Sequence, residues 1–174
     1  MVYDADGKVI SSGYEEYSEY SPKPAWIELN PDEIWTKMKR AIKKSLKNID
    51  AAEIESLSFS VLGEAVMPMS KDGKWLYPAI TAYDARSFGY ADLLKWWDKK
   101  FGSLNIFQIT GLPLNSMPSV HKILWIRENM PQIFQKTWKF VCFEDYLIFK
   151  LCGETAISHS LASRTMMLLS LIHI

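Results

Sequence analysis

The stretch MPSVHKILWIREN, residues 117–129, does most to decide the fold. Residues 120–129 within it predict a helix, and the proline at position 131 separates that helix from a second one over residues 132–138. Trp125 is expected in the core because it falls at helical spacing. His121 lies beside Lys122 in the same helix. We interpret it as a partly exposed helical histidine rather than a catalytic base.

The part of the chain before this stretch predicts strands around one early helix. Asn30 begins that helix, because it can cap, a proline follows at the first position, and two acids follow near the positive end of the dipole. A turn at residues 4–7 predicts a hairpin between residues 1–4 and a strand over residues 8–20. Further strands are expected over residues 54–62, which should be buried, and in a hairpin of residues 66–69 and 75–81.

The remaining segments predict mainly helices. Residues 92–101 form a short amphipathic pattern ended by Gly102. Residues 105–111 are expected to connect into a helix, residues 140–151 to form an aromatic-rich helix, and residues 158–167 to begin a further strand. Strands come first and helices later, with one helix between strands. That order indicates an α/β or α+β chain with a mixed sheet.

The composition excludes several classes of function. The chain has 174 residues, 48% of them hydrophobic, which suits one globular domain with its own core. Twenty basic and twenty acidic side chains cancel, so we expect neither nucleic acid nor an anionic membrane as a partner. Apolar runs stay shorter than the ~18 residues that a membrane span requires.

Cysteine usage points to a reducing compartment. Cys142 and Cys152 lie in an apolar stretch without nearby histidines, so they predict two buried thiols rather than a metal site or a disulfide. This pattern fits the cytoplasm.

A set of eight further aromatic side chains is expected in the core at helical spacing, not on a surface that stacks nucleic acid bases. They are Trp96, Trp97, Phe101, Phe134, Trp138, Phe143, Tyr146 and Phe149.

Residues 117–129 resemble the first signature of the FGGY family of carbohydrate kinases. The residues that match its constrained positions are Met117, Ser119, Lys122, Trp125, Glu128 and Asn129. Other segments are similar to the family in the same order: residues 4–10, 26–28, 30–35, 77–80, 84–86, 110–112, 145–147, 151–154 and 160–165. The resemblance covers residues 1–168, which we interpret as an amino-terminal, sugar-binding domain that is incomplete at both ends.

The resemblance implies a fold and an activity. The fold would be a ribonuclease H-like domain of the actin-like ATPase superfamily, of the α/β class, with a mixed β-sheet flanked by helices. Such kinases close two domains around a cleft and use MgATP, which binds mostly to the second domain. The catalytic aspartate is expected beyond Ile174, so no residue here is assigned to catalysis, cofactor or metal. This fragment is therefore expected to be inactive alone.

Three residues are implied to contact the sugar. Glu64 follows a predicted strand end and aligns with a family carboxylate or histidine. Asp84 either accepts a sugar hydroxyl or pairs with Arg86 to hold its loop. Met117 is expected to form an apolar wall. Lys122 is expected to have a structural role, in an ion pair or a helix cap.

Departures from the family pattern leave the sugar unidentified. Leu62 and Gly63 replace polar residues, Ala82 stands where many members carry Trp, and Ser158 stands where Asp is usual. The loss of the Trp predicts a roomier pocket than one for glycerol. We expect a sugar or sugar derivative of the pentulose, hexulose or gluconate class as substrate of the full-length parent. The alternative is a non-catalytic carbohydrate-binding or interaction module.

The two ends also differ from the family. Its first central strand, which carries an Asp-x-Gly-Thr phosphate loop, is expected to be missing before residue 1. Residues 1–4 and 54–61 would lie on either side of that strand. We therefore predict poor solubility or a homo-oligomer formed through the gap. Residues 169–174 depart from the family pattern and resemble a translated sequencing adapter, so we interpret them as a non-native tail.

Overall fold

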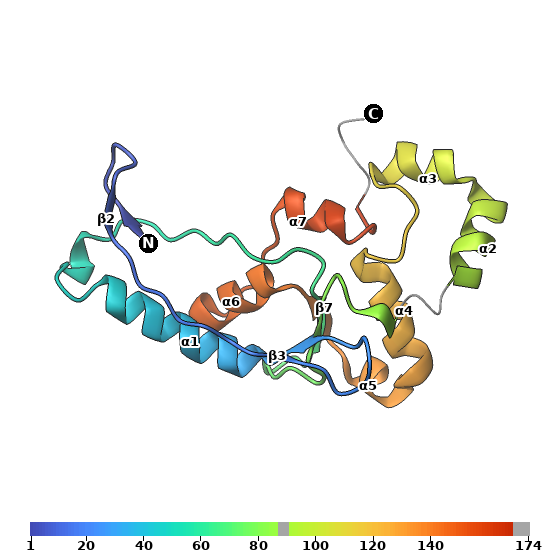
Figure 1. The fold of residues 1–174 in the computed structure, drawn as a ribbon, viewed down its shortest axis with the longest axis horizontal. Helices are drawn as coiled ribbons and strands as arrows, with labels where there is room; N and C mark the ends of the chain where they lie inside the picture. The colour runs from blue at the N-terminus through green and yellow to red at the C-terminus, as the bar shows by residue number, and fades with distance from the viewer. Residues whose placement is uncertain (87–90, 169–174) are drawn as a thin grey trace.

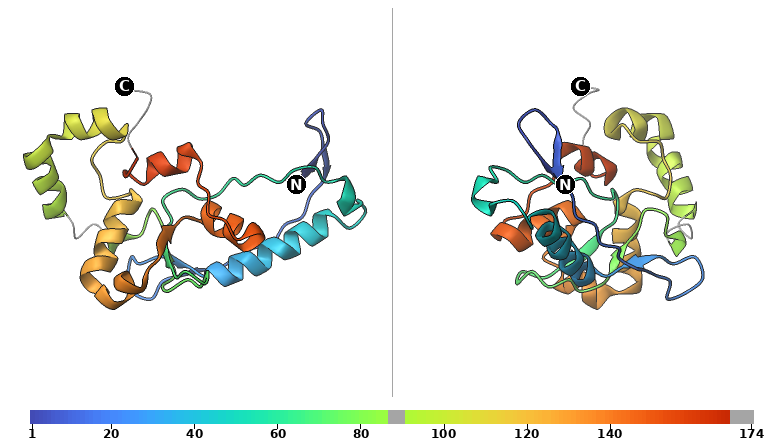
Figure 2. Two further views of the ribbon diagram at one scale, coloured as in Figure 1. Left: turned by 180° about the vertical axis from the view of Figure 1, so that it is seen from behind. Right: turned by 60° about the vertical axis from the view of Figure 1, so that its left-hand side comes forward.

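The computed structural model describes residues 1–86 and 91–168 of the chain. An amino-terminal hairpin and helix α1 lie towards one end, and helices α2 and α3 lie at the other end (Figures 1 and 2). The elements, in chain order, are β1 (Val2–Tyr3), β2 (Val9–Ser11), β3 (Glu19–Tyr20), β4 (Glu28–Leu29), α1 (Pro31–Ser45), the 3₁₀ turn η1 (Ala51–Glu53), β5 (Met67–Met69), β6 (Ala79–Ile80), α2 (Ala91–Phe101), α3 (Ser103–Thr110), α4 (Ser119–Asn129), α5 (Pro131–Lys136), β7 (Lys139–Val141), α6 (Phe143–Cys152) and α7 (His159–Arg164).

The strands within the described residues form three small sheets, and every named strand pair in them is antiparallel. Their orders are β1-β2, β3-β4-β6 and β5-β7. A bridge between Val66 and Ile80 links the start of β5 to β6. Helices and strands thus mix along the chain, as expected for the fold class. The single mixed sheet that we expected is not formed by these strands, because residues 54–62, which we expected to form a buried strand, belong to no sheet within the described residues.

Helix α1 begins where its first residues predicted, because Asn30 caps it. The Asn30 side chain accepts hydrogen bonds from the backbone N–H groups of Asp32 and Glu33, at 3.0 and 3.2 Å. These bonds satisfy two of the amides that a helix leaves free at its start. Lys43 and Lys44 lie in the last turn, where the helix dipole favours positive charge. The predicted start of this helix is confirmed.

Two clusters of buried apolar side chains form the core. The first surrounds β5, β7 and α6 and consists of Leu29, Ala65, Met67, Met69, Ala79, Val141, Phe143, Tyr146 and Leu147. The second is smaller and consists of Ile80, Trp125 and Ile126, with partly buried residues such as Trp26 and Tyr77 packed against it. Three aromatic rings of this second group, those of Trp26, Tyr77 and Trp125, also lie against the buried Arg86 guanidinium.

Several predicted elements are wrong. Residues 54–62 are mostly exposed and extended rather than a buried strand. Residues 105–111 are not a connection, because α3 occupies most of them and ends where Gly111 takes a left-handed φ of 74°. The predicted strand over residues 158–167 is instead helix α7, which Ser158 caps. The aromatic helix begins at Phe143 rather than 140, because residues 139–141 pair with β5.

Some burial predictions are also wrong. Cys142 is buried but Cys152 is exposed, and both thiols are free. Trp96, Phe101 and Trp138 are between 41% and 49% exposed, so they lie outside the core. The proposed tail, residues 169–174, lies outside the described residues. Within the described part of the chain, no helix is long and apolar enough to cross a membrane.

Candidate functional site

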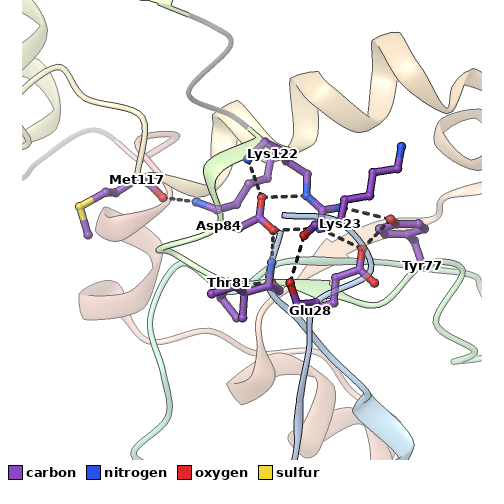
Figure 3. Close-up of polar contacts among 10 residues, drawn as sticks. Lys23, Glu28, Tyr77, Thr81, Asp84, Met117 and Lys122 are labelled. Carbon is purple, nitrogen blue, oxygen red and sulfur yellow. Dashed lines mark hydrogen bonds and ion pairs between the residues drawn. The ribbon is translucent and has the colours of Figure 1, made fainter. Parts of the chain in front are cut away.

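Asp84 lies at the centre of a buried network of charges (Figure 3). It is fully buried. Its carboxylate accepts hydrogen bonds from the Arg86 backbone N–H, from Arg86 Nε and from Arg86 Nη2, each at 2.8 Å. It also accepts the backbone N–H of Ile27 at 2.5 Å. Of the two roles expected for Asp84, the structure therefore contains the ion pair with Arg86.

The Arg86 guanidinium extends this network to two further residues. Its Nη2 donates to Glu28 Oε1 at 2.9 Å, and its Nη1 donates to the Tyr77 hydroxyl at 3.1 Å. Burial alone would lower the pKa of Arg86, but the hydrogen bonds and charges of Asp84 and Glu28 outweigh burial and raise it. Burial, together with a hydrogen bond to Glu28, raises the pKa of Tyr77 to about 12. The network thus stays ionised on Arg86 and neutral on Tyr77 at physiological pH.

Aromatic rings enclose the same guanidinium. Its central carbon lies 4.0 Å from the centre of the Trp26 ring and 5.0 Å from that of Trp125. The two rings meet edge to face, 5.2 Å apart. A cation held against aromatic faces in this way gains electrostatic stabilisation where water is excluded. Trp125 therefore has a role beyond core packing, because it covers the charge that orients Asp84.

Glu64 lies on a strained turn that points its side chain inward. Its φ is 61°, in the left-handed region that few residues other than Gly adopt. Its carbonyl accepts the Ser119 hydroxyl at 3.2 Å. Its carboxylate oxygen Oε1 lies 2.6 Å from Arg164 Nη2, at the end of α7. The Glu64 side chain is thus held by an ion pair at a turn whose backbone is strained.

Lys122 connects the three residues expected at the sugar site. Its side chain is fully buried, and its ammonium donates to the Met117 carbonyl (Figure 3). Burial lowers its pKa to about 8, against the opposing attraction of the Glu64 and Asp84 carboxylates. Those carboxylates are thus near enough for their charges to act on the ammonium. The partner of this ammonium is thus a backbone carbonyl just before α4, and the structural role of Lys122 stays a prediction.

His121 is not the partly exposed histidine that we expected. It is fully buried, its ring centre lies 5.7 Å from that of Trp97, and within the described residues neither ring nitrogen has a hydrogen-bond partner. Burial lowers its pKa to about 4. The sequence suggested exposure because Lys122 follows directly. Both side chains are buried instead, since α4 is packed on more than one face.

The other signature residues occupy the surface and the end of α4. Met117 is 42% exposed, which leaves its thioether available to an incoming ligand. Asn129 donates to the Trp125 carbonyl at 2.9 Å and so supports the last turn. Glu128 lies 3.5 Å from Arg127, with both side chains about half exposed. Met117 is thus exposed, and its contact with a sugar stays a prediction, whereas Asn129 supports the helix.

Two features of the chain concern MgATP. Among residues 1–86 and 91–168, no group of three or more His, Cys, Asp or Glu side chains is arranged to hold a metal ion. The sequence also lacks a glycine-rich phosphate loop of the G-x-x-x-x-G-K type.

Comparison with known proteins identifies the family of this chain. Residues 1–169 match the N-terminal domain of the FGGY family of carbohydrate kinases. The chain belongs to this family. It is 31% identical over 173 residues to glycerol kinase from Thermococcus gammatolerans and 33% identical over 178 residues to glycerol kinase 1 from Saccharolobus solfataricus. Each alignment covers 96% of this chain but 34% of the relative, so the chain spans about a third of their length.

Solved structures of FGGY kinases share the fold. Glycerol kinase from Plasmodium falciparum matches with a TM-score of 0.79 and 27% identity, over 94% of this chain and 34% of that one. Gluconate kinase from Lactobacillus acidophilus matches with a TM-score of 0.85 and 23% identity, over 96% of this chain and 33% of that one. The second likeness concerns the fold alone. The mixed α/β architecture is therefore that of the FGGY kinases.

Two partners of the site residues were missed by the sequence reading. Arg164 was recognised within a family segment but not as the partner of Glu64. The pair was missed because 100 residues separate the two and because α7 was predicted to be a strand. Glu28 was recognised at a helix entry but not as a partner of Arg86. A buried arginine next to a single aspartate signals a further acceptor, because its five N–H groups need more than one carboxylate. The sequence does not show, however, which acid provides this second acceptor for Arg86.

Proposed function

We propose that the polypeptide to which this chain belongs transfers a phosphoryl group from MgATP to a hydroxyl of a sugar or sugar derivative. The family membership and the glycerol kinase relatives support this reaction class. This chain would supply part of the sugar-binding lobe and would be inactive alone. Phosphoryl transfer depends on in-line positioning and charge neutralisation, and we expect the groups on the phosphate side to come from the rest of the polypeptide.

Glu64 carries the proposal for the sugar site. A buried carboxylate on a strained turn, already held by a guanidinium, is a pre-oriented hydrogen-bond acceptor. Arg164 contacts Oε1, so a sugar hydroxyl could donate to the other carboxylate oxygen without breaking the ion pair. The Met117 side chain is exposed, and its carbonyl accepts a hydrogen bond from Lys122. We propose that this side chain covers the C–H face of the same sugar.

Asp84 is proposed to act mainly by holding the substrate loop. Four N–H groups already fill its carboxylate, and it is fully buried. It would fix the segment that carries Ala82, which is also buried and small. A small residue there favours a substrate larger than glycerol, which supports the pentulose, hexulose or gluconate class. We also propose a cytoplasmic location, in keeping with the two free thiols.

A phosphorylation assay tests the reaction. The 174-residue chain and a longer polypeptide that includes its flanking sequence would be incubated with MgATP and a panel of pentuloses, hexuloses, gluconate and polyols. We expect ADP release from the longer polypeptide with a pentulose, hexulose or gluconate, and none from the 174-residue chain. Phosphate transfer by the short chain, or failure of the long one with every substrate, would overturn the proposal.

A pair of variants tests the sugar site. Replacing Glu64 by Gln in the longer polypeptide removes a charged acceptor, whose hydrogen bond is worth about 1.5–3 kcal/mol. We expect kcat/KM to fall by roughly 10- to 150-fold. Glu154→Gln is the matched control, because Glu154 is exposed and makes no part of the site. Equal activity of the two variants would rule out Glu64 as a substrate contact.

A further inference from the structure

We propose that the first turn of helix α4 positions the Glu64–Arg164 ion pair for the sugar, with Ser119 as the positioning residue. This inference rests on the proposed function, because it takes Glu64 as the acceptor of a sugar hydroxyl. Ser119 is fully buried, so it does not contact the sugar itself. It acts through Glu64, whose carbonyl accepts the Ser119 hydroxyl at 3.2 Å.

The backbone of Glu64 needs a contact that holds it. Its φ of 61° lies in the left-handed region, which is unfavourable for a residue with a Cβ. A conformation of this kind persists only where the surrounding structure fixes it. Relaxation of φ would turn the Cα–Cβ bond and carry the carboxylate away from Arg164. The Ser119 hydroxyl opposes this relaxation, because it binds the carbonyl of the strained residue itself.

The Cys142 thiol fixes the direction of the Ser119 hydroxyl. Burial raises the pKa of this thiol to about 12, so it keeps its proton at physiological pH, and it forms a hydrogen bond with Ser119. A serine hydroxyl has one proton to donate and two lone pairs to accept with. The thiol therefore donates to Ser119 Oγ, and the serine's own proton is left for the Glu64 carbonyl. Cys142 is held in turn by its capping box with Asp145 at the start of α6.

The same turn of α4 also holds the segment that carries Arg164. The backbone N–H of Val120 donates to the Thr165 carbonyl at 3.2 Å. This N–H is one of those that a helix leaves free at its start, so no bond within α4 is lost. Thr165 directly follows Arg164, and the next residue, Met166, is buried with a φ of 61°. Two adjacent positions of α4 therefore hold both partners of the ion pair.

The turn that carries Ser119 is itself held in place. The buried Lys122 ammonium donates to the Met117 carbonyl (Figure 3), and the backbone N–H of His121 donates to the Pro118 carbonyl at 3.3 Å. The position of the Ser119 hydroxyl is thus set before a sugar arrives. Such preorganisation increases affinity, because the groups that bind the ligand need not be ordered during binding.

Kinetics of the longer polypeptide test this role, with whichever sugar it phosphorylates. Ser119→Ala should raise the KM for the sugar roughly 2- to 12-fold, the change that corresponds to one neutral hydrogen bond. The KM for ATP should stay unchanged. Ser119→Cys keeps a weak S–H donor and should give a KM between those of Ser119→Ala and the wild type. A structural defect alone would lower the active fraction, and hence kcat, without changing either KM, and that result would overturn the proposal.

Ser45→Ala is the matched control. Ser45 is also buried, and its hydroxyl donates to the Ile42 carbonyl at 2.9 Å, but it lies at the end of α1. This variant loses the same kind of hydrogen bond without a link to Glu64. We expect both KM values of Ser45→Ala to equal those of the wild type. An equal rise in the KM for the sugar in Ser45→Ala and Ser119→Ala would contradict a specific role of Ser119.

A double variant shows whether Ser119 acts through Glu64. Glu64→Gly removes the carboxylate, and glycine adopts a φ of 61° without strain. In this background Ser119→Ala has no carboxylate to position, so it should change kcat/KM by less than about twofold. The same loss of kcat/KM in both backgrounds would show that Ser119 acts by another route.

Crystal structures of the longer polypeptide test the positioning without any assay of activity. Glu64 Oε1 lies 2.6 Å from Arg164 Nη2. In Ser119→Ala we expect this distance to exceed about 4 Å, the limit of an ion pair, and in Ser45→Ala we expect no change. An intact pair in Ser119→Ala would refute this inference. If the wild type phosphorylates no sugar, the proposed function fails, and these structures still decide whether Ser119 positions Glu64.

Discussion

Replacing Arg86 by Met should remove about 3–5 kcal/mol from the free energy of unfolding. The Arg86 side chain is fully buried and lies 2.8 Å from Asp84 and 2.9 Å from Glu28, two acids that are themselves buried. Met has similar length but no charge, so the variant leaves both carboxylates without a counter-ion. Removal of one partner from a buried ion pair costs about 3–5 kcal/mol. For a chain of this size, the melting temperature should fall by roughly 6–20 °C.

The measurement is urea unfolding followed by tryptophan fluorescence, since Trp26 and Trp125 lie against Arg86. The control is Arg127→Met, because Arg127 is 53% exposed and 3.5 Å from an equally exposed acid. An exposed pair of this kind contributes about 0–1 kcal/mol. The reasoning fails if Arg86→Met costs no more than Arg127→Met. As a second check, adding Asp84→Asn to Arg86→Met should cost less than the sum of the single changes, because the unpaired charge is removed.

Three other changes test local features. The depressed pKa of His121, about 4, means that wild-type stability is fully present above pH ~6.5 and falls by up to about 3 kcal/mol as the pH drops to ~4. The free energy of unfolding of His121→Phe, measured at pH ~6.5 and ~4, should not show this decrease. The same pH dependence as in the wild type would contradict the assignment to His121. Asn30→Ala should cost ~1 kcal/mol by thermal melting through loss of the α1 cap, and no effect would contradict that cap. Gly13→Ala should cost ~1–3 kcal/mol in the same assay, because its Cβ would lie 2.0 Å from the Ala41 carbonyl oxygen; a stability equal to wild type would show that α1 moves freely.

Local chemistry explains which elements were predicted correctly. Asn30 and the residues after it start a helix in any context, because the cap and the charges act within one turn. Gly102 ends α2 for an equally local reason. Its φ is 79°, and glycine is the residue type that adopts this angle without strain. The same rule should have revealed α3, which Gly111 ends in the same way. That helix was missed because the polar residues within it concealed the helical spacing.

Long-range contacts explain the failures at the candidate site. Whether His121 is buried depends on Trp97, a residue on another helix. The Glu64–Arg164 pair joins residues far apart in the chain, and its formation depends on α7 being a helix. No local pattern contains that information. The residue types at the site were thus predictable, but their partners were not.

The sequence by itself determined the family and the starts and ends of several helices. These features follow from side-chain chemistry within a few positions, and from motifs in a fixed order. Tertiary structure alone decided that Glu28 joins Asp84 as a partner of Arg86, and that Glu64 is held by Arg164. The reason is that burial and pairing depend on which distant segments arrive at the same place, and the free energy of a buried charge is set by those neighbours.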